Sequence, residues 1–210
     1  VPTDNPPYHA GGWVTEISPE ERRKIWLGGF DCMARIHRLD YNDAGFGFLE
    51  QPEWGETPID RQLNQYKRYL EWAARGRTQP TAEAALEWLE KNKPTNEPTG
   101  IVWGDARIGN IIFAEDSSPA AVVDWEMVTL GSPETDVGWA LFVDRHHSEG
   151  LSVPRLEGFP DYDETVAFYE EKSGHTLSNL HYYQGLNDIA AVLIAVLGDE
   201  PAVAGLCRTA

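Results

Sequence analysis

The segment from Ile101 to Asp124 constrains the fold more than any other part of the chain, because polar residues interrupt its short apolar runs. The apolar runs are IVW, IIF and AAVV, which end at Trp103, Phe113 and Val123. Short β-branched runs bounded by Gly, Asp, Ser and Pro are typical of strands. The segment therefore predicts three short strands, with a polar loop between the first two and a tight turn before the third.

The ends of these strands direct three polar side chains toward one place. Asp105 begins the polar loop, Asn110 ends it, and Asp124 follows the third strand. A hairpin returns the chain to its starting point, so Asn110 and Asp124 are predicted to lie close together. Carboxylate and amide oxygens suit Mg²⁺, which takes one or two carboxylates plus phosphate oxygens and water. A carboxylate left off the metal can orient or deprotonate a hydroxyl, and Arg107 offers a fork of donors to a phosphate.

The spacing of these residues resembles the catalytic core of the aminoglycoside phosphotransferase and choline kinase family, which shares the protein-kinase-like fold. The family pattern is Asp, a basic residue two positions later, Asn five positions later, and Asp at the end of the following hairpin. Here those positions are Asp105, Arg107, Asn110 and Asp124. The segments GDARIGN and VVDWEMVTLGSPETDVGWALF are most similar to bacterial phosphotransferases, including relatives fused to or encoded near acyl-CoA dehydrogenases.

The resemblance implies a role for each matched residue. Asp105 would accept or orient the proton of the acceptor hydroxyl, and Arg107 would balance charge on the transferring phosphate. Asn110 and Asp124 would hold Mg²⁺, with ATP as the co-substrate. Asp136, in the GSPETD segment, would support the catalytic loop by accepting backbone N–H bonds.

The sequence departs from the family two residues before the catalytic Asp, where His is common and Trp103 stands here. That His braces the catalytic loop, residues 103–110, by hydrogen bonding. A tryptophan offers only an N–H donor. The bracing of the loop is therefore expected to differ, with Trp103 in a supporting position.

The rest of the chain predicts helices. Caps and apolar stripes predict them at residues 18–39, 57–75, 81–92, 134–147, 162–173 and 178–197. Residues 127–133 are expected to be a shortened activation loop. The fold class is therefore mainly α with a small β-hairpin, and the resemblance implies the C-terminal lobe of a protein-kinase-like fold.

No Gly-rich phosphate loop and no VAIK-like strand precede the first helix. We therefore expect residues 1–17 to be a linker from an absent N-terminal lobe, and residues 18–210 to form the helical C-lobe. The chain would be a fragment that is inactive by itself. A surface normally covered by the small lobe would be exposed, which invites homodimers.

Several other residues carry weaker predictions. Helices after the activation loop form the substrate cleft wall in this family, so the resemblance suggests substrate contacts at Asp161, Asp163, Tyr182, Tyr183 and Asp188. His37 is expected to be a core residue. The pair His146 and His147 is not expected to bind a metal, because adjacent helical residues do not face one site.

Composition excludes several classes of protein. An apolar content of 41% with eight Trp in 210 residues indicates a single globular domain. Two cysteines, Cys32 and Cys207, form no disulfide framework, and the sequence shows neither a signal peptide nor a membrane-length apolar run, so a cytoplasmic location is expected. The net charge of −17 argues against nucleic acid or an anionic membrane as partner.

Three classes of function follow from these observations. The leading hypothesis is transfer of a phosphoryl group from ATP to a hydroxyl of a small molecule. The alternative is a non-catalytic, pseudokinase-like binding module, which Trp103 and the absent lobe favour but the intact Asp105, Asn110 and Asp124 oppose. A metal-dependent hydrolase is the weakest hypothesis, because no His ligands accompany the two carboxylates.

Overall fold

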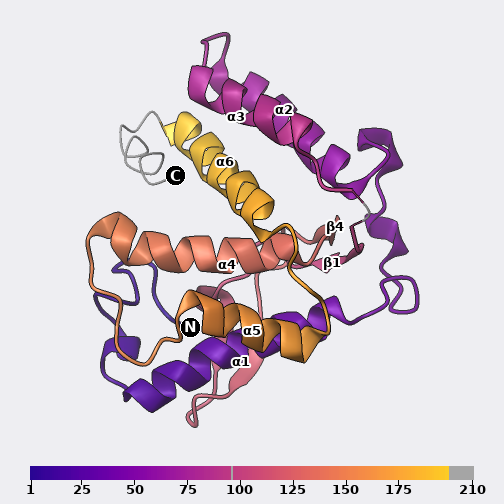
Figure 1. Cartoon of the computed structure of the whole chain (residues 1–210). Coiled ribbons are helices and arrows are strands. Elements are labelled where there is room, and N and C mark those ends of the chain that lie inside the picture. The colour runs from indigo at the N-terminus through magenta and orange to yellow at the C-terminus, as the bar shows by residue number, and fades with distance from the viewer. Residues whose placement is uncertain (96, 199–210) are drawn as a thin grey trace.

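The computed structural model of the chain describes residues 1–95 and 97–198 (Figure 1). The helices are α1 Pro19–His37, α2 Pro58–Ala74, α3 Pro80–Lys91, α4 Glu134–His147, α5 Tyr162–Ser173 and α6 Leu180–Gly198. The strands are β1 Gly100–Val102, β2 Ile111–Phe113, β3 Pro119–Val122 and β4 Thr129–Gly131. Short 3₁₀ helices lie at Trp13–Thr15, Gly47–Leu49, Pro52–Trp54, Ile108–Asn110 and Glu149–Leu151. All six predicted helices are present, with ends within two residues of the expected positions.

Helix α1 shows how local sequence sets the position of a core helix. Ser18 accepts the backbone N–H of Glu21 at 3.2 Å, and the Glu21 carboxylate accepts the N–H of Ser18 at 2.9 Å, which is a capping box. Pro19 occupies the first turn, where its missing N–H costs nothing. The buried face of the helix then follows the apolar stripe through Ile25, Trp26, Phe30, Met33 and Ala34.

Gly28 and Gly29 let α1 approach the β2–β3 hairpin closely. A Cβ on Gly28 would lie 2.8 Å from Cγ of Pro119, and a Cβ on Gly29 would lie 3.2 Å from methyl carbons of Ile108 and Ile111. Such distances are shorter than ordinary carbon contacts, so a larger side chain would push the hairpin away from the helix. The two glycines therefore allow close packing of α1 against the segment that carries Asn110.

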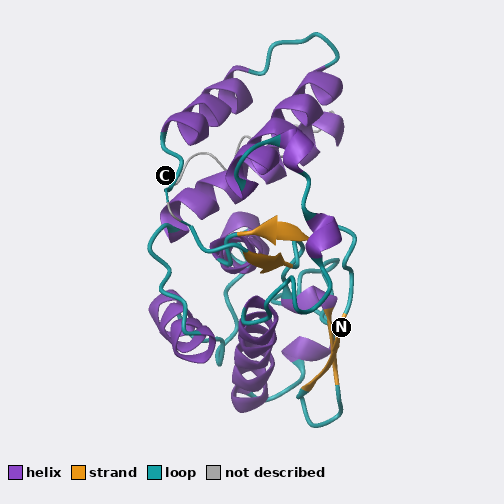
Figure 2. Cartoon of the chain, turned by 90° about the vertical axis from the view of Figure 1, so that its right-hand side faces the viewer, coloured by secondary structure: helices purple, strands orange, loops and turns teal. Residues whose placement is uncertain are grey.

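The strands form two separate two-stranded antiparallel sheets, β1 with β4 and β2 with β3 (Figure 2). In the first sheet Ile101 pairs with Leu130, and in the second Ile111 pairs with Val122. The prediction of a single hairpin was therefore incomplete, because residues 127–133 include β4. This strand has only three residues and no apolar run of its own, and its hydrogen bonds come from β1, which is distant in sequence.

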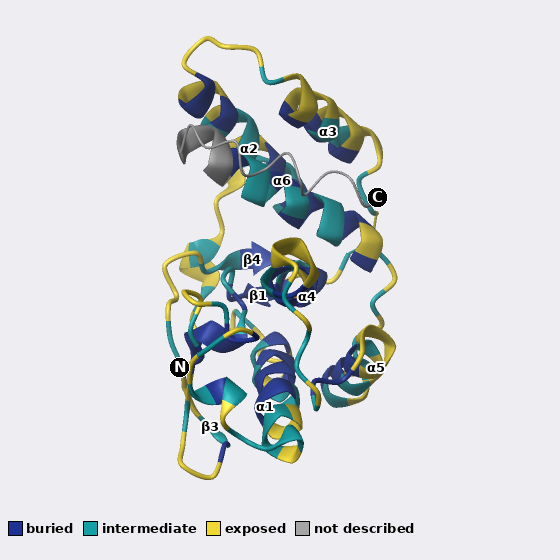
Figure 3. Cartoon of the chain, turned by 90° about the vertical axis from the view of Figure 1, so that its left-hand side faces the viewer, coloured by how far each residue is buried: buried dark blue, intermediate teal, exposed yellow. Residues whose placement is uncertain are grey.

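Two apolar clusters form the interior. The first lies among α1, α4, α5 and the catalytic loop, and includes Trp26, Phe30, Trp103, Val137 and Tyr169. The second joins α2, α3 and α6, and includes Leu63, Leu70, Leu89, Tyr183 and Leu186. Helix α6 lies between α4 and the α2–α3 pair (Figure 1), and the outer faces of α2 and α3 are exposed (Figure 3). None of the described helices combines the length and apolar character needed to cross a membrane.

The N-terminal segment, predicted as a linker over residues 1–17, packs against the first cluster. Tyr8, His9 and Val14 are buried. The Asp144 carboxylate on α4 accepts the Tyr8 hydroxyl at 2.8 Å, lies 2.9 Å from Nε2 of His9, and accepts Nε–H of Arg155 at 2.7 Å. Burial alone would raise the pKa of Asp144, but the His9 hydrogen bond and the Arg155 charge outweigh it and hold that pKa below its ordinary value.

One prediction falls outside the described part of the chain. Cys207 and the other residues from 199 onward are not described, so the end of the predicted unit 18–210 lies outside the described residues. Cys32 is a free, half-buried thiol on α1, and burial raises its pKa.

Candidate active site

The fully buried Asp136 of α4 holds the start of the catalytic loop through hydrogen bonds to its backbone. Its carboxylate accepts the backbone N–H of Trp103 at 2.7 Å and of Gly104 at 2.8 Å, which are the bonds that the resemblance led us to expect. Nε2 of His37 lies 2.9 Å from the same carboxylate, and its Nδ1 lies 2.6 Å from the Tyr169 hydroxyl. His37 is thus a core residue that orients Asp136 rather than an open ligand.

Gly104 has to be a glycine for two reasons. Its φ of 93° lies in the left-handed region, which side-chain-bearing residues rarely adopt. A Cβ at this position would also lie 2.4 Å from the carbonyl oxygen of Met127. The chain after Asp124 therefore passes directly over the start of the catalytic loop.

The Asp105 carboxylate is the centre of the site, because three side chains donate to it. Trp139 Nε1 donates to Oδ1 at 2.7 Å, and Asn110 Nδ2 donates to Oδ2 at 2.7 Å. Arg107 Nε lies 3.1 and 3.0 Å from the two oxygens. The side chain is only 17% exposed. These donors fix the carboxylate in one orientation, as a group that must orient a reacting hydroxyl requires.

Arg107 lies between two carboxylates. Its Nε contacts Asp105, and its Nη1 donates to Asp4 of the N-terminal segment. Burial alone would lower the pKa of Arg107, but the Asp4 hydrogen bond and the Asp105 charge outweigh it and raise that pKa above its ordinary value. The guanidinium is therefore a fixed positive charge next to Asp105.

Asn110 and Asp124 meet at the end of the β2–β3 hairpin. The backbone N–H of Val123 donates to the Asn110 carbonyl at 3.0 Å, so Asp124 follows directly on this bond. Asp124 is exposed and adopts a φ of 63°, a conformation that Asp tolerates better than most residues. Within the described structure, neither the Asp124 carboxylate nor Oδ1 of Asn110 has a hydrogen-bond partner. These two hard oxygen groups have the chemistry that Mg²⁺ requires.

Trp103 supplies the bracing that the sequence left open. Its side chain is fully buried, and its indole Nε1 lies 3.0 Å from the carbonyl oxygens of both Val123 and Asp124. The bracing therefore uses the single donor of the indole and ties the catalytic loop to the backbone of Asp124. The strained φ of Asp124 is held by this contact.

The structure does not bring the predicted substrate contacts together at the site. Asp161 caps α5 by accepting the N–H of Glu164 at 2.8 Å, and the Tyr182 hydroxyl donates to the Leu89 carbonyl at 3.1 Å. The Tyr183 hydroxyl donates to Glu97, and Asp188 lies 3.9 Å from Arg145. No contact of the Asp163 side chain is described. Four of these five side chains therefore have local partners, and nothing places any of the five beside Asp105.

Sequence reasoning missed two residues of the site, Trp139 and Asp4. Trp139 is half-buried, and its indole N–H reaches Asp105. A signal existed, because Trp139 lies three residues after Asp136 and thus on the same side of α4. Asp4 had no signal, because it lies in an irregular segment 103 residues from Arg107.

Two histidines near the site have buried ring nitrogens without partners. Nδ1 of both His146 and His147 has no hydrogen bond, although Nδ1 of His147 lies 3.9 Å from an Asp4 oxygen. Among the residues that the structure describes, no group of three or more His, Cys, Asp or Glu is arranged to hold a metal ion. An ion at Asn110 and Asp124 would therefore complete its shell with water and phosphate oxygens.

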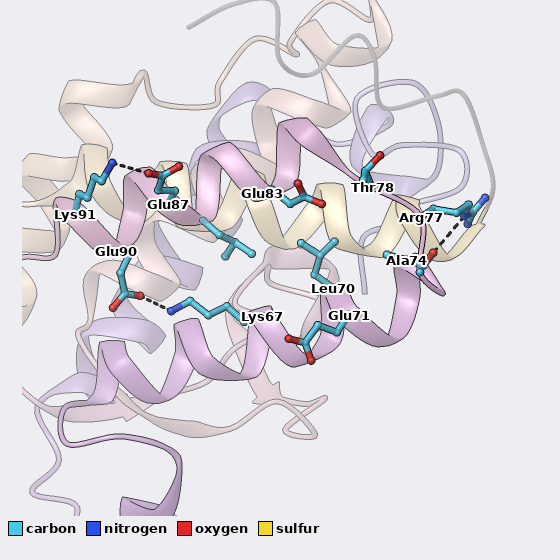
Figure 4. Close-up of a pocket in the computed structure, with 12 residues that line it drawn as sticks. Lys67, Leu70, Glu71, Ala74, Arg77, Thr78, Glu83, Glu87, Glu90 and Lys91 are labelled. Carbon is cyan, nitrogen blue, oxygen red and sulfur yellow. Dashed lines mark hydrogen bonds and ion pairs between the residues drawn. The ribbon is translucent and has the colours of Figure 1, made fainter.

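A large surface hollow lies away from Asp105, Asn110 and Asp124. It is a groove of about 750 Å³ between α2 and α3 (Figure 4). Leu70 and Leu86 are among its lining residues, and Lys67 of α2 pairs with Glu90 of α3 at 2.7 Å. None of the predicted site residues lines this groove. A smaller hollow of about 360 Å³, between α1 and β3, is bounded by Trp125 next to Asp124.

Residues 7–168 match the sequence model of a protein family described as the phosphotransferase enzyme family. The chain belongs to this family. The match confirms the resemblance on which the roles of the loop residues were based. The matched range also includes the segment with Tyr8 and His9, which packs on α4.

The curated relatives of this chain are much longer proteins. It is 31% identical over 151 residues to acyl-CoA dehydrogenase family member 10 of Mus musculus, covering 71% of this chain and 13% of that protein. It is 32% identical over 187 residues to acyl-CoA dehydrogenase family member 11 of Gallus gallus, covering 83% and 23%. The chain thus spans less than a quarter of these relatives.

Solved structures share the phosphotransferase fold. A candidate aminoglycoside phosphotransferase from Ralstonia eutropha JMP134 superposes with a TM-score of 0.75 at 24% identity, covering 91% of this chain and 63% of that one. An aminoglycoside 3'-phosphotransferase and a macrolide 2'-phosphotransferase superpose with TM-scores of 0.59 and 0.56. The likeness establishes a kinase-like fold for the described residues.

Proposed function

We propose that this chain is the C-terminal lobe of an ATP-dependent phosphotransferase that acts on a hydroxyl of a small molecule. The observation that carries the proposal is the Asp105 carboxylate, which is half-buried, held by three donors and joined to Asn110 by a 2.7 Å hydrogen bond. A carboxylate held in this way beside open oxygen ligands suits in-line transfer, where catalysis is positioning plus charge stabilisation.

Each residue has a separate task in this proposal. Asp105 accepts a hydrogen bond from the acceptor hydroxyl and takes its proton as the hydroxyl oxygen bonds to the γ-phosphorus and the bond from that phosphorus to the leaving ADP breaks. Asn110 and Asp124 provide the oxygens for Mg²⁺, which would offset charge on the ATP phosphates when bound. Arg107 provides donors to the phosphoryl group, and Trp103 and Asp136 keep the loop in place.

The hairpin also offers a platform for the nucleotide base. Ile111 is buried, whereas Ile112 is 44% exposed two residues after Asn110. Trp125 is 38% exposed directly after Asp124. Apolar side chains beside the oxygen ligands suit a flat aromatic base, with the base covered from the other side by a second lobe. The same exposed side chains are the surface through which the chain alone would form homodimers.

The acceptor is a small hydroxyl compound, and two features point to different chemistries. The net charge of −17 favours a cationic compound, whereas the longer relatives are named as acyl-CoA dehydrogenase family members. Solved proteins of the same fold are named for both aminoglycoside and macrolide acceptors. A screen of amino sugars, choline-like amines and hydroxyacyl compounds for ATP consumption would identify the class.

The proposal is tested by two substitutions in the full-length protein with both lobes. Asp105→Asn should lower the transfer rate by roughly 10²–10⁴ and leave Mg²⁺–ATP binding largely intact, because the proton acceptor is lost while both proposed metal ligands remain. Asp124→Asn should weaken Mg²⁺–ATP binding itself, because a metal ligand is lost. Glu149→Gln, at an exposed acid that begins the 3₁₀ helix Glu149–Leu151, is the matched control. Equal and mild effects of both substitutions would favour the binding-module alternative instead.

A further inference from the structure

The hydrogen bonds of Arg107 do not follow the pattern that an arginine prefers beside a carboxylate. Arginine usually pairs with a carboxylate through two parallel N–H···O bonds. Here only Nε faces Asp105, at 3.0 and 3.1 Å from its oxygens, and Nη1 donates to Asp4 instead. Nη2 has no partner among the described residues. The Asp4 carboxylate therefore tethers Nη1 and limits rotation of the guanidinium toward Asp105.

The position of Asp4 is built into the fold. Tyr8 and His9 anchor its segment to the buried Asp144 of α4. The backbones of Asp4 and Pro7 form an isolated antiparallel β-bridge, and the Thr3 hydroxyl donates to the Pro6 carbonyl at 2.8 Å. The turn that carries Asp4 is therefore itself hydrogen-bonded. The ion pair with Arg107 is one more contact of an already anchored segment, which reduces the entropy cost of holding it.

Gly109 provides the space for this ion pair. A Cβ at position 109 would lie 2.6 Å from Nη1 of Arg107 and 3.1 Å from Oδ1 of Asp4. The glycine is buried, and it does not have a left-handed backbone. Its lack of a side chain is thus explained by the Arg107–Asp4 contact rather than by backbone strain.

We propose that Asp4 is a positioning residue for phosphoryl transfer, which keeps Arg107 from forming a two-bond pair with Asp105. This inference rests on the proposed function. With Asp4 in place, Nη2 stays available to a phosphoryl oxygen, and the acceptor hydroxyl can approach Asp105. Without Asp4, the guanidinium is expected to turn so that Nε and Nη2 each donate to one oxygen of Asp105, and then to compete with the acceptor.

Two variants of the full-length protein test this role, one by removing the charge of Asp4 and one by blocking its contact with Arg107. Asp4→Asn removes the charge, and Gly109→Ala keeps every charge but places a methyl group between Arg107 and Asp4. Both should lower kcat about tenfold while the KM for ATP changes less than twofold, because Asn110 and Asp124 are untouched. Asp4→Glu should recover part of the loss. Glu16→Gln, an exposed acid in the same segment, is the charge-matched control.

A spectroscopic readout on the 210-residue chain is independent of activity. The Nε–H signal of Arg107 in a ¹H–¹⁵N spectrum should shift in Asp4→Asn and Gly109→Ala, and stay unchanged in Glu16→Gln. An Asp4→Asn enzyme with wild-type kcat, or an unshifted Arg107 signal, would overturn the role of Asp4. A wild-type protein that transfers no phosphate to any compound in the screen would instead overturn the proposed function. The Arg107 signal would then still show whether Asp4 controls how Arg107 pairs with Asp105.

Discussion

Replacing Glu134 with glutamine should change how the stability of this chain depends on pH. Glu134 begins α4 and is only 4% exposed. Both of its carboxylate oxygens accept the backbone N–H of Asn179, at 3.1 and 2.9 Å, next to the start of α6. Burial is the main cause that raises its pKa from 4.5 to about 7, and the nearby charges of Glu97 and Glu170 add to it.

The sign follows from proton binding. Between pH 4.5 and about 7 the folded chain holds the Glu134 proton while the unfolded chain releases it, so folding becomes less favourable as pH rises through this window. The loss is complete above pH 7. At about 1.36 kcal/mol per pH unit, the difference between 4.5 and about 7 corresponds to roughly 3 kcal/mol. That is a large share of the stability of a typical domain.

The measurement is urea unfolding of the wild-type chain and of Glu134→Gln at pH 5 and pH 8. The wild type should lose up to roughly 3 kcal/mol between the two values. Glu134→Gln should lose much less, because glutamine does not ionise and keeps a carbonyl acceptor for Asn179. A small dependence will remain, because burial also raises the pKa of Glu97. The exposed Glu149→Gln is the control. A Glu134→Gln chain with the same loss as the wild type would refute the reasoning.

Three further predictions concern the site. Trp139→Phe in the full-length protein should lower kcat about tenfold or more at constant KM for ATP, since a hydrogen bond to a charged group contributes about 1.5–3 kcal/mol; a kcat within twofold of wild type would contradict this. Gly104→Ala should destabilise the chain by roughly 2 kcal/mol or more, because the backbone is left-handed and Met127 is in the way; an unchanged thermal midpoint would be inconsistent with that. The 210-residue chain alone should bind Mg²⁺–ATP weakly in calorimetry, and sub-micromolar binding would show that the nucleotide contacts have been misplaced.

The helices and the catalytic loop were predictable because their signals are local. Ser18 and Glu21 form the capping box that the sequence predicts, and Asp136 reaches the loop as the family pattern implies. The roles of Asp105 and Asn110 remain proposals, but their proximity follows from a loop only five residues long. In each case the interacting groups are close in sequence or fixed by a helix or hairpin of known geometry.

The parts that were missed depend on contacts between distant segments. Strand β4 exists only because β1 supplies its hydrogen bonds. Asp144 gives no local signal that it will be buried against His9 and Tyr8. Asp4 contacts Arg107 in a structure in which its segment is packed on α4. Such contacts depend on where whole elements come to lie, which the period of a helix or strand does not specify.

The contact of Trp103 with the backbone of Asp124 also gives the molecule an internal optical probe. The rings of Trp103 and Trp125 have centroids 6.0 Å apart and planes inclined by 37°. Trp103 contacts the Asp124 carbonyl, and Trp125 directly follows Asp124 in the chain. Indoles this close couple their electronic transitions, so the near-ultraviolet circular dichroism of the chain carries a contribution from this one pair. A change in that contribution on addition of Mg²⁺–ATP would therefore report movement at the end of the hairpin without any label.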